Sequence, residues 1–248
     1  NLFRRLFGEG ALTASFLPVY TKLDRDHPEV GRRFAGLMLA MLAILLSGLT
    51  IVGEVALYLL RDMTATPALG LQLMMVMLPY MPLVCLVALV GAMLQTHGRF
   101  GPSAASPIIL NVAIVAAAFY GSYYAANMGL GAHIESVPHI EIVAWSVIAA
   151  GLMQLAWNLW ALRHHRIRPH LELRANWPHL KEVLVKAIPM LLGLGIFQVN
   201  TFVDGLVASY QTMVGPTIMG VEYPLPPGSM TVLSYGQRLY EFPLGVFG

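Results

Sequence analysis

The chain has 248 residues, of which 57% are hydrophobic and only 11% are charged. Soluble domains carry about 25% charged residues, so this composition excludes a soluble enzyme, a secreted disulfide scaffold and a disordered chain. A single cysteine, Cys85, leaves no basis for a disulfide framework or a thiolate metal site. The sequence therefore predicts an all-α polytopic membrane protein.

Long runs without charge indicate where the chain crosses a membrane, because a helix needs about 20 apolar residues to do so. Four such runs cover 34–53, 63–96, 100–134 and 142–162. Together with the apolar segments at either end of the sequence, they predict about seven transmembrane helices. In chain order these are 2–22, 32–60, 67–96, 104–126, 140–162, 180–211 and 229–248. Pro79, Pro82 and Pro189 fall inside predicted helices and predict kinks.

The distribution of Lys and Arg predicts the orientation, because these residues collect in cytoplasmic connections. Eleven of them lie in or beside the connections 22–33, 96–102 and 163–180, whereas the alternate connections hold only Arg61. We therefore expect those three connections to be cytoplasmic and residue 1 to lie near the outer face. The chain then reads as a piece of a longer polypeptide, with at least one earlier span.

Three predicted helices carry charged or other polar side chains spaced to share one face. They are Arg4, Arg5, Glu9 and Thr13 on the first; Asn200, Asp204 and Gln211 on the sixth; and Ser234, Gln237, Arg238 and Glu241 on the last. Ionisable groups within a span normally face a bundle interior or a hydrated cavity. We expect a hydrated central cavity in which arginines bind an anion, since a guanidinium donates two hydrogen bonds to a phosphate. The alternative is interfacial anchoring with internal salt bridges such as Arg5–Glu9 and Arg238–Glu241.

No phosphate-cradling Gly-Lys loop, nucleophile elbow or His-Glu-x-x-His motif occurs in the sequence. The sequence therefore predicts no cofactor, no metal and no catalytic residue. The spacing of the His and Glu residues between positions 133 and 141 matches no ligand signature.

Three blocks of the sequence resemble one family. They are Asn1-Leu-Phe-Arg-Arg-Leu-Phe-Gly-Glu-Gly-Ala-Leu-Thr-Ala-Ser-Phe-Leu-Pro-Val-Tyr20; Leu78-Pro-Tyr through Gly91, Arg99-Phe100 and Pro107 to Asn111; and Leu233-Ser-Tyr-Gly-Gln-Arg-Leu-Tyr-Glu-Phe-Pro-Leu-Gly-Val-Phe-Gly248. They are similar to the second, the fourth and fifth, and the eighth helices of the lipid II flippases (MurJ, also called MviN). This family belongs to the multidrug/oligosaccharidyl-lipid/polysaccharide exporter superfamily.

The resemblance implies spans two to eight of a V-shaped fold with two lobes and fourteen helices. The first lobe would occupy 1–162, a basic cytoplasmic linker 163–179, and the start of the second lobe 180–248. Arg4, with Glu9 beside it, would be a cavity arginine of the first lobe, and Arg238 the facing arginine of the second. Gln237 stands where the family usually has Asp or Asn, so Glu241 or Asp204 would partner Arg238 instead.

The resemblance also implies a transporter rather than an enzyme, located in the bacterial cytoplasmic (inner) membrane. It would move lipid II, the undecaprenyl-diphosphate-linked peptidoglycan precursor, from the inner to the outer leaflet by alternating access, with arginines holding the diphosphate. Its partners would be this lipid, the membrane lipids and the cell-wall synthesis machinery, but no nucleic acid. The alternatives are another polysaccharide-lipid or multidrug exporter of the superfamily, or a non-transporting scaffold for cell-wall synthesis.

Overall fold

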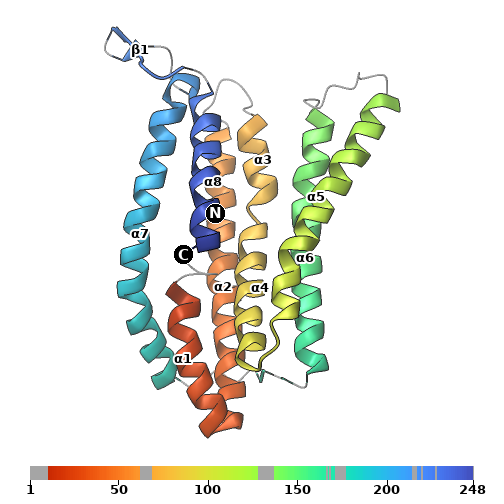
Figure 1. Cartoon of the computed structure of the whole chain (residues 1–248), viewed down its shortest axis with the longest axis vertical. Helices are drawn as coiled ribbons and strands as arrows, with labels where there is room; N and C mark the ends of the chain where they lie inside the picture. The colour runs from red at the N-terminus through yellow and green to blue at the C-terminus, as the bar shows by residue number, and fades with distance from the viewer. Residues whose placement is uncertain are drawn as a thin grey trace. The chain divides into compact units, whose positions relative to one another are not determined.

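A computed structural model describes residues 11–61, 69–127, 137–165, 167, 169–170, 177–213, 217–218, 220–226 and 228–247. The elements are α1 (Ala11–Asp26), α2 (Pro28–Arg61), α3 (Leu69–Met77), α4 (Tyr80–Thr96), α5 (Gly101–Asn127), α6 (Val137–His164), α7 (Trp177–Met213), β1 (Thr217–Ile218), β2 (Val221–Glu222) and α8 (Ser229–Phe247) (Figure 1). The chain divides into two compact units, Asn1–Leu191 and Leu192–Gly248. The lobe boundaries that we expect at 162 and 180 stay a prediction.

The helices extend beyond the apolar runs, because polar residues at their ends remain helical. Only His27 separates α1 from α2, where the sequence indicated a longer connection. Pro28 begins α2, a position at which its missing amide hydrogen costs nothing. Glu29 in the first turn of α2 accepts a hydrogen bond from Arg32 at 3.0 Å. The charged residues of the connection 22–33 are thus mostly helical.

The predicted helix over 67–96 is interrupted in the middle. A turn at Leu78 and Pro79 separates α3 from α4. The prediction of a kink here is confirmed, since proline cannot continue the hydrogen-bond ladder of the preceding helix. Pro82 lies in the first turn of α4, where it is tolerated.

Four helical segments are long and apolar enough to cross a membrane, as far as the described residues go: Pro28–Leu59, Gln72–Thr96, Gly101–Tyr123 and Ile140–His164. Each contains most of one of the four charge-free runs read from the sequence. A helical membrane protein is therefore confirmed, and the count of seven spans stays a prediction.

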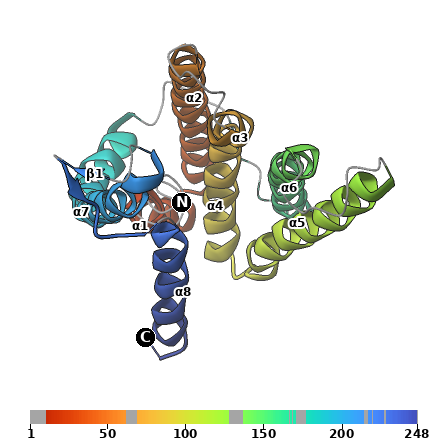
Figure 2. The same cartoon turned by 90° about the horizontal axis from the view of Figure 1, so that it is seen from above.

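The core of the first unit lies where α1, α2 and α4 meet. Phe16, Phe34, Met38, Leu89 and Met93 belong to one cluster of buried apolar side chains. Both views show α4 between α2 and the α5–α6 pair (Figures 1 and 2). The helix α4 therefore packs against the core on one side and against α5 and α6 on the other.

In the second unit, a short antiparallel hairpin of β1 and β2 lies between α7 and α8, with Thr217 opposite Glu222. Sequence reasoning did not predict these strands. The Tyr223 hydroxyl, just after β2, donates a hydrogen bond to the Val207 carbonyl of α7 at 2.7 Å. The Tyr223 and Tyr210 rings lie 4.7 Å apart. These two contacts therefore hold the segment after β2 against α7.

Candidate functional site

The structure describes few of the arginine and acidic side chains that are predicted to line the central cavity. Arg4, Arg5 and Glu9 lie outside the described residues. Arg238 and Glu241 belong to α8, but the description of that helix does not extend to these two side chains. Their proposed role as an anion clamp stays a prediction.

The polar stripe of α7 is partly described. The Asn200 amide donates a hydrogen bond to the Asp204 carboxylate at 3.4 Å. This contact, one helical turn apart, means that the two side chains share a face of α7. Asp204 and Gln237 of α8 are both half-buried, whereas Asn200 is exposed.

The start of α8 lies against α7 one residue beyond Asp204. A Cβ atom placed on Gly205 would lie 3.7 Å from the terminal methyl carbon of Met230. The first turn of α8 thus meets α7 at the level of its acidic residue. Gln237 follows about two turns further along α8.

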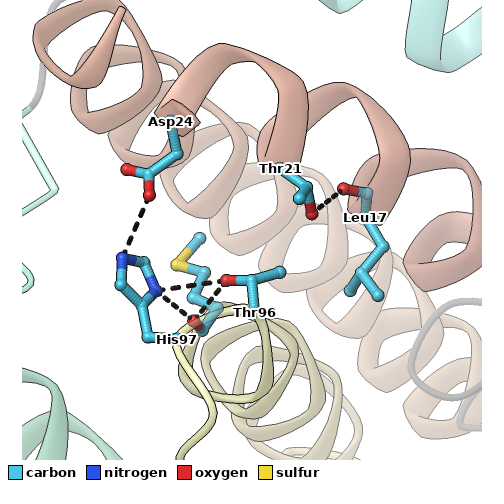
Figure 3. Close-up of polar contacts among 6 residues, drawn as sticks. Leu17, Thr21, Asp24, Thr96 and His97 are labelled. Carbon is cyan, nitrogen blue, oxygen red and sulfur yellow. Dashed lines mark hydrogen bonds and ion pairs between the residues drawn. The ribbon is translucent and has the colours of Figure 1, made fainter. Parts of the chain in front are cut away.

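A second polar cluster, which sequence reasoning missed, joins α1 to the end of α4 (Figure 3). The Nε2 atom of His97 lies 3.1 Å from the Asp24 carboxylate, and both side chains are between a quarter and a third exposed. The other ring nitrogen, Nδ1, lies 2.9 Å from the Met93 carbonyl. A carbonyl only accepts, so Nδ1 carries a hydrogen, and Nε2 attracts Asp24 when it is protonated as well. The ring in its cationic form therefore satisfies both contacts.

The same histidine borders the aromatic part of the core. Its ring lies 6.2 Å from the ring of Tyr20, which stacks on Phe16 at 5.1 Å. Tyr20 is fully buried, and its hydroxyl has no hydrogen-bond partner among the described residues. The Asp24–His97 pair thus closes one end of a packed aromatic column between α1 and α4.

A third polar cluster lies between α4, α5 and α6, within three of the candidate spans. The Gln154 amide of α6 donates to the Ser106 carbonyl of α5 at 2.6 Å and accepts from the Tyr80 hydroxyl of α4 at 3.4 Å. The Asn158 amide donates to the Ser106 hydroxyl at 2.8 Å. Gln154, Ser106 and Asn158 are all buried. In the sequence, this cluster is indicated by Gln154 and Asn158, which lie four residues apart in a charge-free run.

Beside this network is a cavity of about 500 Å³, which we name the amide pocket. Apolar and small residues form much of its wall: Val84, Val87, Ala88, Gly91, Ala92, Pro107 and Leu110. Its polar lining consists of amides and hydroxyls: Tyr80, Gln95, Ser103, Ser106, Asn111 and Gln154.

Two glycines let α4 approach its neighbours around the pocket. A Cβ atom on Gly151 of α6 would lie 2.8 Å from a ring carbon of Tyr80, closer than real contacts allow. A Cβ atom on Gly91 would lie 3.0 Å from the Cβ atom of Ser103. The missing side chains therefore set the spacing of α4 from α5 and α6.

Apolar helices with amide and ionic clusters between them define the class of this protein, a multi-pass helical membrane protein. The family model described as "Lipid II flippase MurJ" matches residues 1–248. The chain therefore belongs to the MurJ family, and the resemblance read from its three sequence blocks is confirmed.

Individual relatives agree with the family match. The chain is 32% identical over 258 residues to a probable lipid II flippase MurJ of Rhizobium tropici, which covers 100% of this chain and 44% of that protein. A probable lipid II flippase MurJ of Bdellovibrio bacteriovorus is 30% identical over 257 residues, covering 99% of this chain and 44% of that protein. The lipid II flippase MurJ of Burkholderia cenocepacia is 27% identical over 266 residues, covering 100% of this chain and 46% of that protein. The chain spans less than half the length of these curated relatives.

Proposed function

We propose that the protein is a flippase that moves lipid II from the inner to the outer leaflet of the bacterial cytoplasmic membrane. The observation that carries this proposal is the match of the MurJ family model to the whole chain. The names of the relatives describe a transporter of this lipid and not an enzyme. Four apolar helical segments agree with a protein that works within the bilayer.

In the proposed mechanism, Arg4 and Arg5 of the first half and Arg238 of the second bind the diphosphate of the headgroup. A doubly charged headgroup meets a high barrier in hydrocarbon, and guanidinium groups in a hydrated cavity lower that barrier. The cavity opens first inward and then outward as the two lobes rock, while the lipid tail stays in the bilayer. Glu9 beside Arg4, and Glu241 or Asp204 near Arg238, would balance the arginines when no substrate is bound.

Amide groups complete this proposed site on the second half. The Asn200–Asp204 hydrogen bond supports a continuous polar face on α7. The half-buried Gln237 precedes Arg238 directly in α8, and we assign it to the cavity together with Asn200 and Asp204.

We further propose that the connections 22–33, 96–102 and 163–180 face the cytoplasm and that residue 1 lies near the outer face. Contacts between these connections support a common side. His97 of the second pairs with Asp24 of the first. The backbone N–H of His170 in the third donates to the Arg32 carbonyl at 2.9 Å. Three basic connections that lie together at one end of the first unit agree with the preference of Lys and Arg for the cytoplasmic side.

The test is complementation in cells depleted of their own flippase, with the protein expressed from its complete gene. Arg4→Ala and Arg238→Ala should each lower lipid II export at least about tenfold, the scale expected when a buried charged contact is lost. Arg163→Ala, at the exposed end of α6, is the matched control and should keep normal export. Normal export by both cavity variants would show that the arginine clamp is wrong.

A further inference from the structure

The amide pocket is a feature that the proposed arginine clamp does not use. It extends along α4 from Tyr80 to Gln95, a length of about 22 Å at the helical rise of 1.5 Å per residue. Gln95 lies at the end of α4 that we expect to face the cytoplasm. The pocket therefore leads from that membrane surface into the apolar span, and its volume of about 500 Å³ is in the range of small-ligand sites.

The deep side of the pocket is held rigid by its own hydrogen bonds. Gln154 connects α4 to α5 through Tyr80 and Ser106, and Asn158 donates to both Ser106 and the Gln154 carbonyl. The Oδ1 atom of Asn158 is buried and has no hydrogen-bond partner within the described residues. A buried acceptor without a donor is costly, so the network is one donor short.

The rim of the pocket differs from its deep side. Asn111 is exposed, and its amide makes no hydrogen bond to any residue that the structure describes. The Gln95 amide, also exposed, donates a hydrogen bond to Ser103 at 3.1 Å, and within the described part of the chain it donates no other. The rim thus offers amide donors and acceptors that a bound molecule can use.

The chemistry of the lining indicates which molecule fits. Among the described lining residues there is no charged side chain, so the pocket is unsuited to a diphosphate. Amides and hydroxyls interspersed with small apolar residues suit a group that is uncharged and carries several hydroxyls or amides.

We propose that the amide pocket binds the uncharged part of the glycolipid headgroup, its sugar hydroxyls and amides. This proposal rests on the proposed flippase function and adds a second contact to it. The pocket, whose described lining carries no charge, selects for the neutral groups of the headgroup and not for its diphosphate. Selectivity of this kind is strong, because a site built to donate and accept hydrogen bonds loses them with a ligand that lacks the matching groups.

The first experiment is photo-crosslinking in proteoliposomes that contain the full-length protein. A benzophenone amino acid replaces Asn111 at the rim, and in the control it replaces the neighbouring Val112, which is 62% exposed and does not line the pocket. The vesicles contain lipid II, or undecaprenyl diphosphate without sugar, or phosphatidylglycerol alone. We expect crosslinks at position 111 to lipid II at least about fivefold above either other lipid, and no such preference at position 112. Equal crosslinking to phosphatidylglycerol or to undecaprenyl diphosphate would overturn the proposal.

The second experiment measures transport. Asn111→Leu and Gln95→Leu should each raise the lipid II concentration for half-maximal flipping about tenfold, the effect of one or two lost hydrogen bonds. Asn111→Gln should restore most of the affinity, and Val112→Leu should change nothing. Folding is checked by the protection of the buried Cys85 from thiol reagents.

The two proposals fail in different ways. Normal transport by the Arg4→Ala and Arg238→Ala variants contradicts the arginine clamp. Impaired transport by those variants, with normal transport by folded Asn111→Leu and Gln95→Leu proteins, contradicts the pocket proposal alone. A Leu variant that loses Cys85 protection is replaced by Asn111→Ser or Gln95→Ser, for which we expect the same loss of affinity.

Discussion

Removal of the Asp24–His97 pair should measurably loosen the contact between α1 and α4. The two groups are 3.1 Å apart and between a quarter and a third exposed, so solvent screens part of their attraction. A charged hydrogen bond contributes about 1.5–3 kcal/mol when shielded, whereas an exposed ion pair gives about 0–1 kcal/mol. We expect about 1 kcal/mol for this pair, which for a unit of this size corresponds to a melting-temperature shift of about 2–4 °C.

A double-mutant cycle isolates this coupling. Asp24→Ala, His97→Ala and the double variant are compared, because His97 also contacts the Met93 carbonyl and its replacement costs stability by itself. Unfolding is followed by thiol labelling of the buried Cys85 in a background without other cysteines.

The control for the cycle is Asp26→Ala, an exposed carboxylate two residues further along α1, paired with His97→Ala. That pair should show additive effects. High salt should shrink the Asp24–His97 coupling, since partly exposed charges are screened. A coupling energy of zero at low salt would refute the reasoning, and so would equal coupling for Asp26.

Three further outcomes are expected. Gly151→Ala should destabilise the protein by about 1–3 kcal/mol in the same labelling assay, because its Cβ atom would lie 2.8 Å from the Tyr80 ring. Tyr20→Phe should leave stability unchanged or raise it by up to about 1 kcal/mol, since it removes a buried hydroxyl without a partner among the described residues; a large loss would mean that this hydroxyl is bonded. Partial burial, followed by the nearby Arg99 charge, lowers the pKa of His165, so its protonation opposes folding, and stability should fall as the pH drops from the ordinary His pKa through the lowered one. Arg99→Gln should raise that pKa in a titration by nuclear magnetic resonance, and an unchanged value would remove Arg99 as a cause.

The positions of the helices could be read from the sequence because they depend on local properties. The four charge-free runs predict the four candidate spans, and Pro79 predicts the break between α3 and α4. The sequence predicts the ends of the helices less accurately. The connection 22–33 is nearly all helical, since apolarity marks the part of a helix in hydrocarbon and not its polar ends.

The sequence alone predicts only part of the candidate site. Charged residues such as Arg4, Arg238 and Asp204 are conspicuous in an apolar sequence, so the sequence alone predicts a role for them. The residues of the amide pocket carry no charge and are spread from Tyr80 to Gln154. Nothing in the sequence indicates that Tyr80 and Gln154, 74 residues apart, form a hydrogen bond.

The sequence by itself determined the membrane class, the main spans, their proposed orientation and the family, because hydropathy, proline positions, basic connections and short motifs are local patterns. Only the tertiary structure decided that Asp24 meets His97 and that α4, α5 and α6 enclose the amide pocket. Such contacts depend on how closely the helices pack, and around the pocket the absence of side chains at Gly91 and Gly151 sets the spacing of α4 from α5 and α6. The effect of a glycine on helix packing can be judged only when the residues opposite it across the helix interface are known.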